Sequence, residues 1–328
     1  MDDNLVNTQQ NNFLKEKLKA LKIIEESAQK NWGHVFLVNN PIAAIVSRAI
    51  IDEYSINIDN VFAISLRNTE TSICGSDTLI VKEYLIDRII FKLFKYNIKS
   101  HRIRRLLEKK YPRFILYTSW YYPEAKIINS SSQCIGHAYI EEGWASYRKL
   151  NTFSQNKHGN VKSLSEDKVK YAENNDNLFR DDAFAFFGLH KDSFPLIDQE
   201  QRFILSGITN LKKYYKPYLL GIKCIGLTCA LRRIDQNKIE DMLAALINHM
   251  PDGGVIKLHP SFIADSALVS RIQSIINRIA PDTIKLCDNS AIIEMEMLYE
   301  SKTIIGPLSS LIKYTEIFES KYQHISLY

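Results

Sequence analysis

The chain carries short, nearly continuous apolar runs, separated by longer stretches in which apolar residues recur every three or four positions. In the first half, runs at residues 35–38 and 61–66 and within RFILYTSW and CIGHAYIEEG predict buried strands. Helical spacing appears in IAAIVSRAIIDEY, at residues 81–94 and in PEAKIINSS, after a lysine-rich amphipathic helix over residues 13–24. Strands that alternate with helices indicate a parallel sheet covered on both faces.

The second half repeats this alternation. It predicts strands in YLLGIKCIGLT, GGVIKLHP, TIKLC and KTIIG, and helices in IEDMLAALINHM, SALVSRIQSIINRI and AIIEMEMLYE, with a terminal helix from Pro307. Residues 151–177 are rich in Asn, Lys and Ser, which is typical of a loop or insertion. We therefore expect an α/β protein with two Rossmann-like domains facing a cleft, at residues 1–200 and 201–328.

Composition narrows the class of protein. The 328 residues include 42 Lys or Arg and 37 Asp or Glu, so the net charge of +5 is only mildly basic. The five cysteines form no CxxC pair, which argues against a zinc site or a disulfide framework and favours a reducing compartment. The start, MDDNLVNTQQNN, lacks a signal pattern, and no apolar run reaches about 18 residues. The expected location is the cytoplasm.

Three short motifs fall where predicted strands end. They are EEG (Glu141, Glu142, Gly143), KLHP (residues 257–260) and GPLSS (residues 306–310). Each is ordinary by itself, as a solvated strand exit, a loop before a proline and a helix cap. Ligands of such sheets, however, bind at the carboxyl ends of the strands. A helix start with two hydroxyls can hold an anion, and a neighbouring histidine can donate to the same anion.

In this order, the motifs resemble the D/E-D/E-G, HP and S-S motifs of bacterial sialyltransferases. The stretch FLVNNPIAAIVSRAI, which contains Asn40, also resembles the first strand, loop and helix of those enzymes. The resemblance implies the two-domain GT-B fold, with a C-terminal helix that packs back on the N-terminal domain. It also implies inverting transfer of sialic acid from CMP-sialic acid to a hydroxyl of an acceptor oligosaccharide.

The resemblance also implies roles for the matching residues. Glu141 would be the general base that takes the proton of the acceptor hydroxyl. His259 would contact the phosphate of CMP and stabilise its charge as it leaves. The expected substrate-binding residues are Glu142, Gly143, Asn40, Lys257, Pro260, Glu294, Ser309 and Ser310. Among these, Ser309 and Ser310 would bind the phosphate and Glu294 the ribose, with Glu296 as the alternative at the ribose.

No metal or other cofactor is expected. No DxD triplet occurs in the sequence, although enzymes with sugar-diphosphate donors often need a divalent ion to offset the leaving charge. A CMP donor leaves as a monophosphate, which hydroxyls, a histidine and a helix start can stabilise. The pair Glu294 and Glu296 could imitate a metal site but is more typical of the surface of an amphipathic helix.

Residues 92–113 contain nine Lys or Arg residues and a single acidic residue, Glu108. This segment is either a solvated helical face or a surface for an anionic partner. Nucleic acid is not expected, because HRIRRLLEKKYPR contains no recognised nucleic-acid motif. Peripheral contact with an anionic membrane fits the charge. Trp120, Tyr121 and Tyr122 follow a strand end, where they could stack on an acceptor sugar or pack in the core.

The resulting prediction is an inverting sialyltransferase that acts on a galactoside of a bacterial surface glycan, such as lipopolysaccharide or capsule, built on a lipid carrier. Two alternatives stay open. One is a transferase for another CMP-activated acid sugar, of the Kdo or legionaminic type. The other is a non-catalytic, basic membrane- or nucleic-acid-binding protein, in which the three motifs are coincidental.

Overall fold

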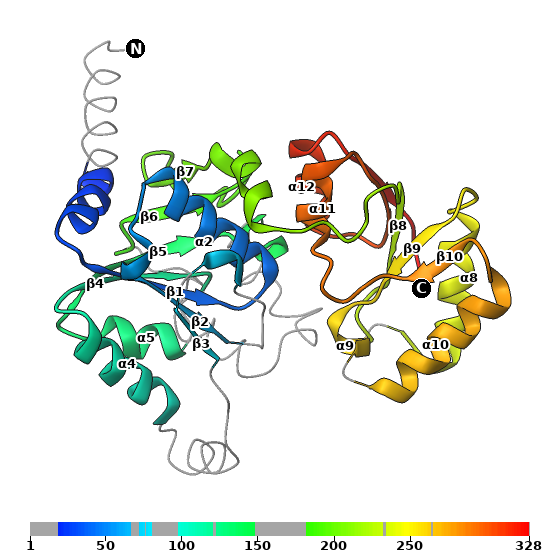
Figure 1. Ribbon diagram of the computed structural model, residues 1–328, viewed down its shortest axis with the longest axis horizontal. Helices are drawn as coiled ribbons and strands as arrows, with labels where there is room; N and C mark the ends of the chain where they lie inside the picture. The colour runs from blue at the N-terminus through cyan, green and yellow to red at the C-terminus, as the bar shows by residue number, and fades with distance from the viewer. Residues whose placement is uncertain are drawn as a thin grey trace. The chain divides into compact units, whose positions relative to one another are not determined.

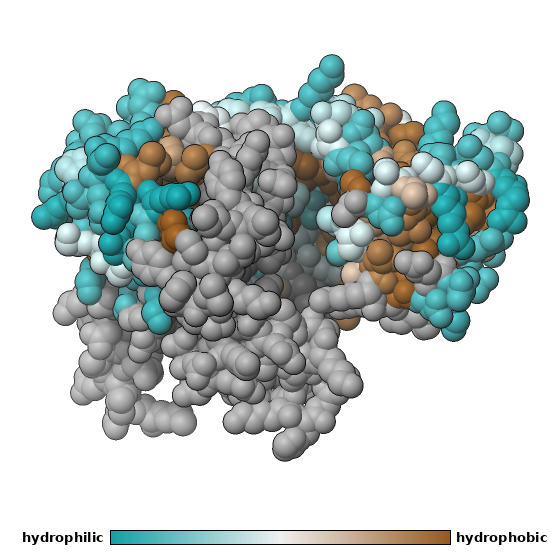
Figure 2. Space-filling view, turned by 90° about the horizontal axis from the view of Figure 1, so that it is seen from below, coloured by the Kyte–Doolittle hydropathy of each residue, from teal (hydrophilic) through white to brown (hydrophobic). Residues whose placement is uncertain are grey.

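The computed structural model describes residues 19–66, 72–75, 77–80, 98–120, 123–147, 182–231, 234–263 and 265–327. The chain divides into two compact units, Met1–Leu211 and Lys212–Tyr328. Each unit is built on its own parallel sheet (Figure 1). On the face shown in Figure 2, hydrophilic residues cover much of the described surface, and hydrophobic residues form smaller patches. Among the described residues, no helix is long and apolar enough to cross a membrane.

The first unit contains a seven-stranded parallel sheet with the order β3-β2-β1-β4-β5-β6-β7. Its strands are β1 (Gly33–Val38), β2 (Val61–Ser65), β3 (Asp77–Ile80), β4 (Phe114–Thr118), β5 (Cys134–Ile140), β6 (Ala185–Gly188) and β7 (Arg202–Ile204). The strands β1, β2, β4 and β6 are buried along their whole length. Burial on both sides explains why they are continuous apolar runs in the sequence.

Helices cover both faces of this sheet. α2 (Pro41–Glu53) lies on one face, and α4 (Ile98–Lys110) and α5 (Pro123–Asn129) lie on the other (Figure 1). Residues 19–29 form a further helix. The short 3-10 turns are η1 (Ile58–Asn60), η2 (Ser72–Cys74), η3 (Trp144–Tyr147) and η5 (Gly207–Tyr214). The core under α4 and α5 includes Val35 and Leu37 of β1 and Leu116 of β4, with Ile103 and Leu107 of α4.

The second unit contains a five-stranded parallel sheet with the order β10-β9-β8-β11-β12. Its strands are β8 (Cys224–Leu227), β9 (Gly254–Lys257), β10 (Ile284–Leu286), β11 (Thr303–Gly306) and β12 (Lys321–His324). Its helices are α8 (Ile239–Asn248), α9 (Pro260–Ile263), α10 (Ser266–Ile279), α11 (Ile293–Tyr299) and α12 (Leu311–Ile317), with η7 (Gln236–Lys238) before α8. α8 and α10 cover one face, and α11 and α12 the other (Figure 1).

Both sheets share one winding pattern. The chain first moves outward from a central strand on one side and then crosses to the other side, between β1 and β4 in the first unit and between β8 and β11 in the second. Ligands of such sheets bind at this switch point, outside the carboxyl ends of the strands. The predicted fold class, α/β with two parallel-sheet Rossmann-like domains, is confirmed.

Two details differ from the sequence-based expectation. The first unit continues to Leu211 instead of ending at residue 200, because β7 (Arg202–Ile204) pairs with β6 and extends the first sheet. The expected terminal helix is the short α12, and it is followed by β12, which pairs with β11 at the edge of the second sheet. The last described element is therefore the strand β12 of the second sheet.

Some predicted features lie outside the described residues. These are the start of the first helix (residues 13–18), the helix at residues 81–94, the polar insertion at residues 151–177, and Tyr121 and Tyr122.

Candidate functional site

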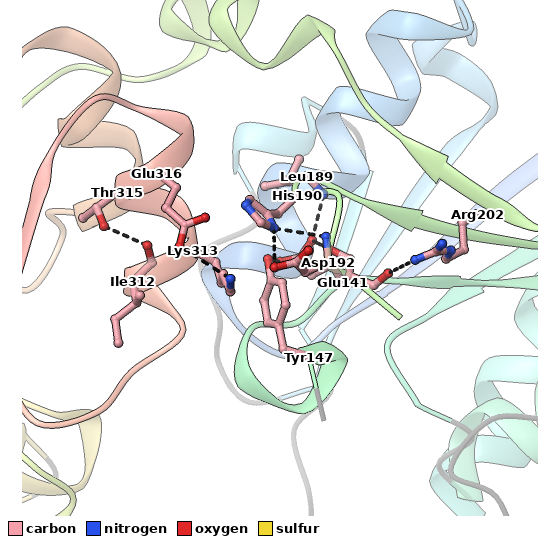
Figure 3. A network of polar contacts seen from close by, with 11 residues as sticks. Glu141, Tyr147, Leu189, His190, Asp192, Arg202, Ile312, Lys313, Thr315 and Glu316 are labelled. Carbon is pink, nitrogen blue, oxygen red and sulfur yellow. Dashed lines mark hydrogen bonds and ion pairs between the residues drawn. The ribbon is translucent and has the colours of Figure 1, made fainter. Parts of the chain in front are cut away.

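In the first unit, the predicted base Glu141 lies directly after β5 and is fully buried. Its Oε2 accepts hydrogen bonds from the backbone N–H of Leu189 at 2.7 Å and from the Ser193 hydroxyl at 2.7 Å. Its Oε1 accepts a hydrogen bond from the phenol of Tyr147 (Figure 3). These three donors hold the carboxylate between η3 and the segment that follows β6.

The residues around the Glu141 carboxylate leave little space beside it. A Cβ atom built on Gly188, the last residue of β6, would lie 2.5 Å from Ser193 Cβ and 3.1 Å from Glu141 Oε2. His190, also buried, packs edge-on against the Tyr147 ring with 6.1 Å between ring centroids. Tyr147 is half-buried, so the residue that donates to this carboxylate is less buried than Glu141 itself.

Glu142 has a different environment. Its side chain is half-buried and accepts a hydrogen bond from the Asn39 amide, which follows β1. The Asn39 oxygen accepts from the Ser119 hydroxyl at 3.2 Å, and Ser119 follows β4. Asn40 donates to the backbone carbonyl of Glu142 at 2.8 Å. The structure thus gathers polar groups from the ends of β1, β4 and β5, at the switch point of the first sheet.

Asn40 and Gly143 have clear local structural roles. The Asn40 side chain accepts a hydrogen bond from Ala43 N at 2.9 Å and so caps α2, with Pro41 at the first helical position. Gly143 has φ = 103°, a backbone conformation that side chains other than hydrogen rarely allow. Its place in EEG therefore permits the sharp turn that separates Glu141 and Glu142 from η3.

In the second unit, His259 follows β9 and is exposed. Its backbone N–H donates to Thr228 Oγ1 at 2.8 Å, which ties the loop to the end of β8. Its Nδ1 lies 3.2 Å from Ser261 N and 2.9 Å from Ser261 Oγ. A backbone N–H can only donate, so Nδ1 of the neutral ring must accept and the proton lies on Nε2. Ser261 thus fixes His259 as a hydrogen-bond donor through Nε2.

Ser309 and Ser310 follow β11 and precede α12. Both are half-buried, and the Ser310 side chain makes no capping hydrogen bond to the helix. The Ser309 hydroxyl accepts from Leu311 N at 3.3 Å. α12 has only 7 residues, so any anion site here would depend on the hydroxyls and the first backbone N–H groups. In the sheet order, β9 with His259 and β11 with the serines flank β8.

Lys257 and Pro260 support the loops around His259. Lys257 Nζ donates to the carbonyls of Asp288 and Asn289, each at 2.9 Å, so it fixes the turn after β10. Burial lowers the pKa of Lys257, against the opposing effect of nearby acidic groups. Pro260 is exposed and begins α9, where its fixed φ suits the first helical position.

The two glutamates of α11 differ in burial and in hydrogen-bond partners. Glu296 is fully buried, and it accepts hydrogen bonds from Tyr215 OH at 2.6 Å, Tyr218 N at 2.8 Å and Leu219 N at 3.0 Å. It therefore holds the segment that leads into the second sheet. Glu294 is half-buried, and burial raises its pKa to about 7. The Glu294 carboxyl group, in contrast, is not held by a comparable set of three donors among the described residues.

Sequence reasoning missed several partners of these groups, namely Asn39, Ser119, Tyr147, His190, Ser193, Thr228 and Ser261. A signal existed for two of them, since Asn39 directly follows a predicted strand and Ser261 lies two residues after His259. Two roles were left open for Trp120, stacking on an acceptor sugar and packing in the core. The structure favours the second, because Trp120 is buried within the core under α4 and α5.

Comparison with known proteins finds similar folds and no similar sequences. No protein-family model matches the chain, and no curated protein matches it by sequence. Solved structures do match it. MnaA of S. aureus, solved with UDP, has a TM-score of 0.53 at 13% identity, over 90% of this chain and 79% of that chain.

Two further structures match in a similar way. The UDP-GlcNAc 2-epimerase of Neisseria meningitidis, bound to UDP-GlcNAc, has a TM-score of 0.50 at 12% identity and covers 89% of this chain and 82% of that chain. A putative UDP-N-acetylglucosamine 2-epimerase of Listeria monocytogenes has a TM-score of 0.54 at 11% identity, over 89% and 78%. At such low identity the likeness establishes the shared two-domain fold and no shared activity.

Proposed function

We propose that this protein is an inverting sialyltransferase, which moves sialic acid from CMP-sialic acid to a hydroxyl of an acceptor glycan. The observation that carries the proposal is the ordered set of EEG, HP and SS motifs at the carboxyl ends of β5, β9 and β11. Those are the strand ends at which ligands of Rossmann-like sheets bind. The acceptor in this proposal is a galactoside of a lipid-linked bacterial surface glycan, of the lipopolysaccharide or capsule type, modified in the cytoplasm.

The sugar-nucleotide part of the proposal has independent support. Structures with the same fold were solved with UDP and with UDP-GlcNAc. These ligands favour a second candidate function, in which the chain acts on a UDP-sugar, for example as an epimerase. A transferase for another CMP-activated acid sugar, of the Kdo or legionaminic type, would use the same leaving group as the first candidate. Only a test of donors separates the three.

On the donor side, the second unit would bind the CMP moiety. His259, with its proton held on Nε2 by Ser261, would donate to the phosphate as the bond to sialic acid breaks. The hydroxyls of Ser309 and Ser310 would bind the same phosphate. Glu294 would contact the ribose, while Lys257 positions the neighbouring turn. No metal or cofactor takes part in this scheme.

On the acceptor side, Glu141 would take the proton of the attacking hydroxyl. The hydrogen bond from Tyr147 to Glu141 offers a route, in which the phenol passes its proton to the carboxylate as it receives the proton of the acceptor. The deprotonated oxygen would then attack the anomeric carbon from the face opposite CMP, which inverts the configuration. Glu142, Gly143 and Asn40 would line the acceptor side through the turn they form.

The deciding experiment offers the purified chain three donors: CMP-Neu5Ac, CMP-Kdo and UDP-GlcNAc, each with and without a panel of galactosides. We expect release of CMP from CMP-Neu5Ac that depends on a galactoside, with a sialylated product by mass spectrometry and an inverted linkage by NMR. Formation of UDP-ManNAc from UDP-GlcNAc, or of ManNAc together with released UDP, would favour the epimerase candidate. No product and no nucleotide binding with any donor would overturn the assignment.

A matched pair of variants ties the result to the proposed site. Ser309→Ala/Ser310→Ala should weaken CMP binding. Ser270→Ala/Ser274→Ala, which removes two exposed hydroxyls from α10, should leave CMP binding unchanged. Equal effects of the two double variants would remove the α12 serines from the phosphate site.

A further inference from the structure

The helix α4 has one side packed in the core and the other facing outward. Ser100, Ile103 and Leu107 are buried, and the last two belong to the core cluster of the first sheet. This spacing of three and four residues places them on one side of the helix. The opposite side must therefore face away from the sheet.

That outward side is strongly basic. Arg102, Arg105 and Lys109 are exposed and follow one another at intervals of three and four residues, so they form a single row. Leu106 lies beside this row with 43% of its surface exposed. We call these four residues the basic face of α4.

The acid of this helix does not neutralise the basic face. Glu108 accepts a hydrogen bond from Ser131 at 2.7 Å and lies 3.6 Å from Arg104, toward α5 and away from the row. Two further cations lie close by over aromatic rings: Lys110 over Phe62 at 4.9 Å and Arg113 over Trp32 at 5.6 Å.

The charges of this helix also act on its histidine. The pKa of His101 is lowered by burial and by the neighbouring charges of Arg104 and Arg105. Lysines and arginines near an anionic lipid surface each contribute about 1 kcal/mol to binding. An exposed apolar side chain beside such a row adds contact with the acyl boundary, as in interfacial helices.

We infer that the basic face of α4 (Arg102, Arg105, Leu106, Lys109) docks the protein on an anionic lipid bilayer, with the cations at the headgroups and Leu106 at their apolar boundary. Charge complementarity identifies the partner as anionic, and Leu106 favours a bilayer over a nucleic acid, which would meet the leucine with phosphates. The inference does not depend on the proposed transferase activity.

The test is flotation of the full chain with vesicles of phosphatidylcholine alone and with added phosphatidylglycerol. We expect binding only to the anionic vesicles, and release at 1 M salt, where the Debye length falls to about 3 Å. Arg102→Gln/Arg105→Gln/Lys109→Gln should weaken vesicle binding about 100-fold, because each charge contributes roughly a factor of five. Leu106→Trp should show a blue-shifted emission with anionic vesicles alone.

The matched control removes the same charge from the second unit. Lys238→Gln/Arg271→Gln/Lys285→Gln changes three exposed basic residues and should bind vesicles like the wild type. Thermal unfolding of both triple variants checks that the fold is intact. Equal binding to neutral and anionic vesicles, or equal loss in both triple variants, would overturn the inference. Binding of duplex RNA through the basic face without vesicle binding would overturn it as well.

Discussion

Buried polar side chains at strand ends are held by donors from distant parts of the chain. Glu141 is the clearest case, because Leu189 N, Ser193 and Tyr147 all donate to its carboxylate. Such a cage orients a carboxylate and also restricts its access. In the proposed mechanism, Glu141 therefore needs Tyr147 to reach the acceptor hydroxyl. Substitution of Tyr147 tests this requirement.

We predict that Glu141→Gln lowers the rate of sialyl transfer by about 10²–10⁴-fold, the usual cost of a lost general base. CMP binding should stay close to normal, because the nucleotide is assigned to the second unit. The amide retains one acceptor for Leu189 N and can donate to Tyr147, so the fold should survive, as thermal unfolding will show.

Two companion variants decide between neighbouring groups. Tyr147→Phe should lower transfer strongly if the phenol relays the proton. Glu142→Gln should have a smaller effect than Glu141→Gln, and the reverse order would move the base to Glu142.

His34 at the start of β1 shows how a buried polar chain affects stability. The Ser27 hydroxyl donates to Ile24 O at 2.5 Å, so its oxygen accepts from His34 Nε2 at 3.2 Å. Nδ1 is then left to accept from Tyr117 OH at 3.1 Å. Burial lowers the pKa of His34 from 6.5 to about 4, because the charged ring would lose its hydration.

The sign of the pH effect follows from this shift. The unfolded chain binds a proton at His34 near pH 6.5, whereas the folded chain binds it only near pH 4. The contribution of neutral His34 to the free energy of unfolding is therefore complete above pH 6.5, and it is lost as the pH falls toward 4. At pH 4 we expect a loss of about 3 kcal/mol.

Denaturant unfolding of the wild type and of His34→Gln between pH 7 and 4 measures this loss. The variant should lack it, so the difference between the two free energies of unfolding isolates His34 from the other titrating groups. A constant difference over this range would contradict the prediction.

At the scale of elements, α11 connects the second sheet to the segment that leads into it. Glu296 holds Tyr215, Tyr218 and Leu219, and the Tyr299 hydroxyl donates to the carbonyl of Lys212 at 2.5 Å. Near the end of the same helix, buried Lys302 donates to the carbonyls of Leu219 at 2.6 Å and Ile222 at 2.8 Å. This segment is thus fixed to the second unit by several buried polar contacts.

We predict opposite phenotypes for the two glutamates of α11. Glu296→Ala should destabilise the protein by about 1–3 kcal/mol, because the buried Leu219 N–H loses its acceptor and an unsatisfied buried donor costs about that much. Glu294→Ala should leave the free energy of unfolding nearly unchanged and weaken nucleotide binding. Denaturant unfolding and CMP titration of both variants measure the two effects. Stable Glu296→Ala with impaired CMP binding would reverse the assignment.

At the scale of the whole molecule, each unit has its own core. One core cluster lies in the first sheet with α4 and α5, and another lies in the second sheet with α8 and α10. The proposed chemistry is divided in the same way, with the base in one unit and the phosphate-binding groups in the other. A ligand that binds one set should therefore protect one unit first.

We predict that CMP slows amide hydrogen exchange mainly in the turns after β9 and β11, around His259 and Ser309. The protection should persist in EDTA, because no divalent ion is assigned to the site. Hydrogen exchange followed by mass spectrometry measures both points. Protection confined to the first unit, or protection that EDTA removes and magnesium restores, would contradict the scheme.

The fold class and most central elements could be predicted from the sequence. Strands such as β1 and β4, buried on both faces, must be apolar throughout, and helices over them must repeat apolar residues every three or four positions. The edge strands β3, β7 and β12 have no such signature. β12, for example, is largely exposed, and its strand conformation comes from pairing with β11.

Which polar residues the fold holds in place depends on tertiary contacts. Glu141 and Glu142 are adjacent and chemically alike in the sequence, as are Glu294 and Glu296 with one residue between them. One member of each pair is buried against backbone N–H groups, from Leu189 for Glu141 and from Tyr218 and Leu219 for Glu296. Those donors lie 48 and 77 to 78 residues away in the chain. Strand order and register bring them together, and no local pattern records such a pairing.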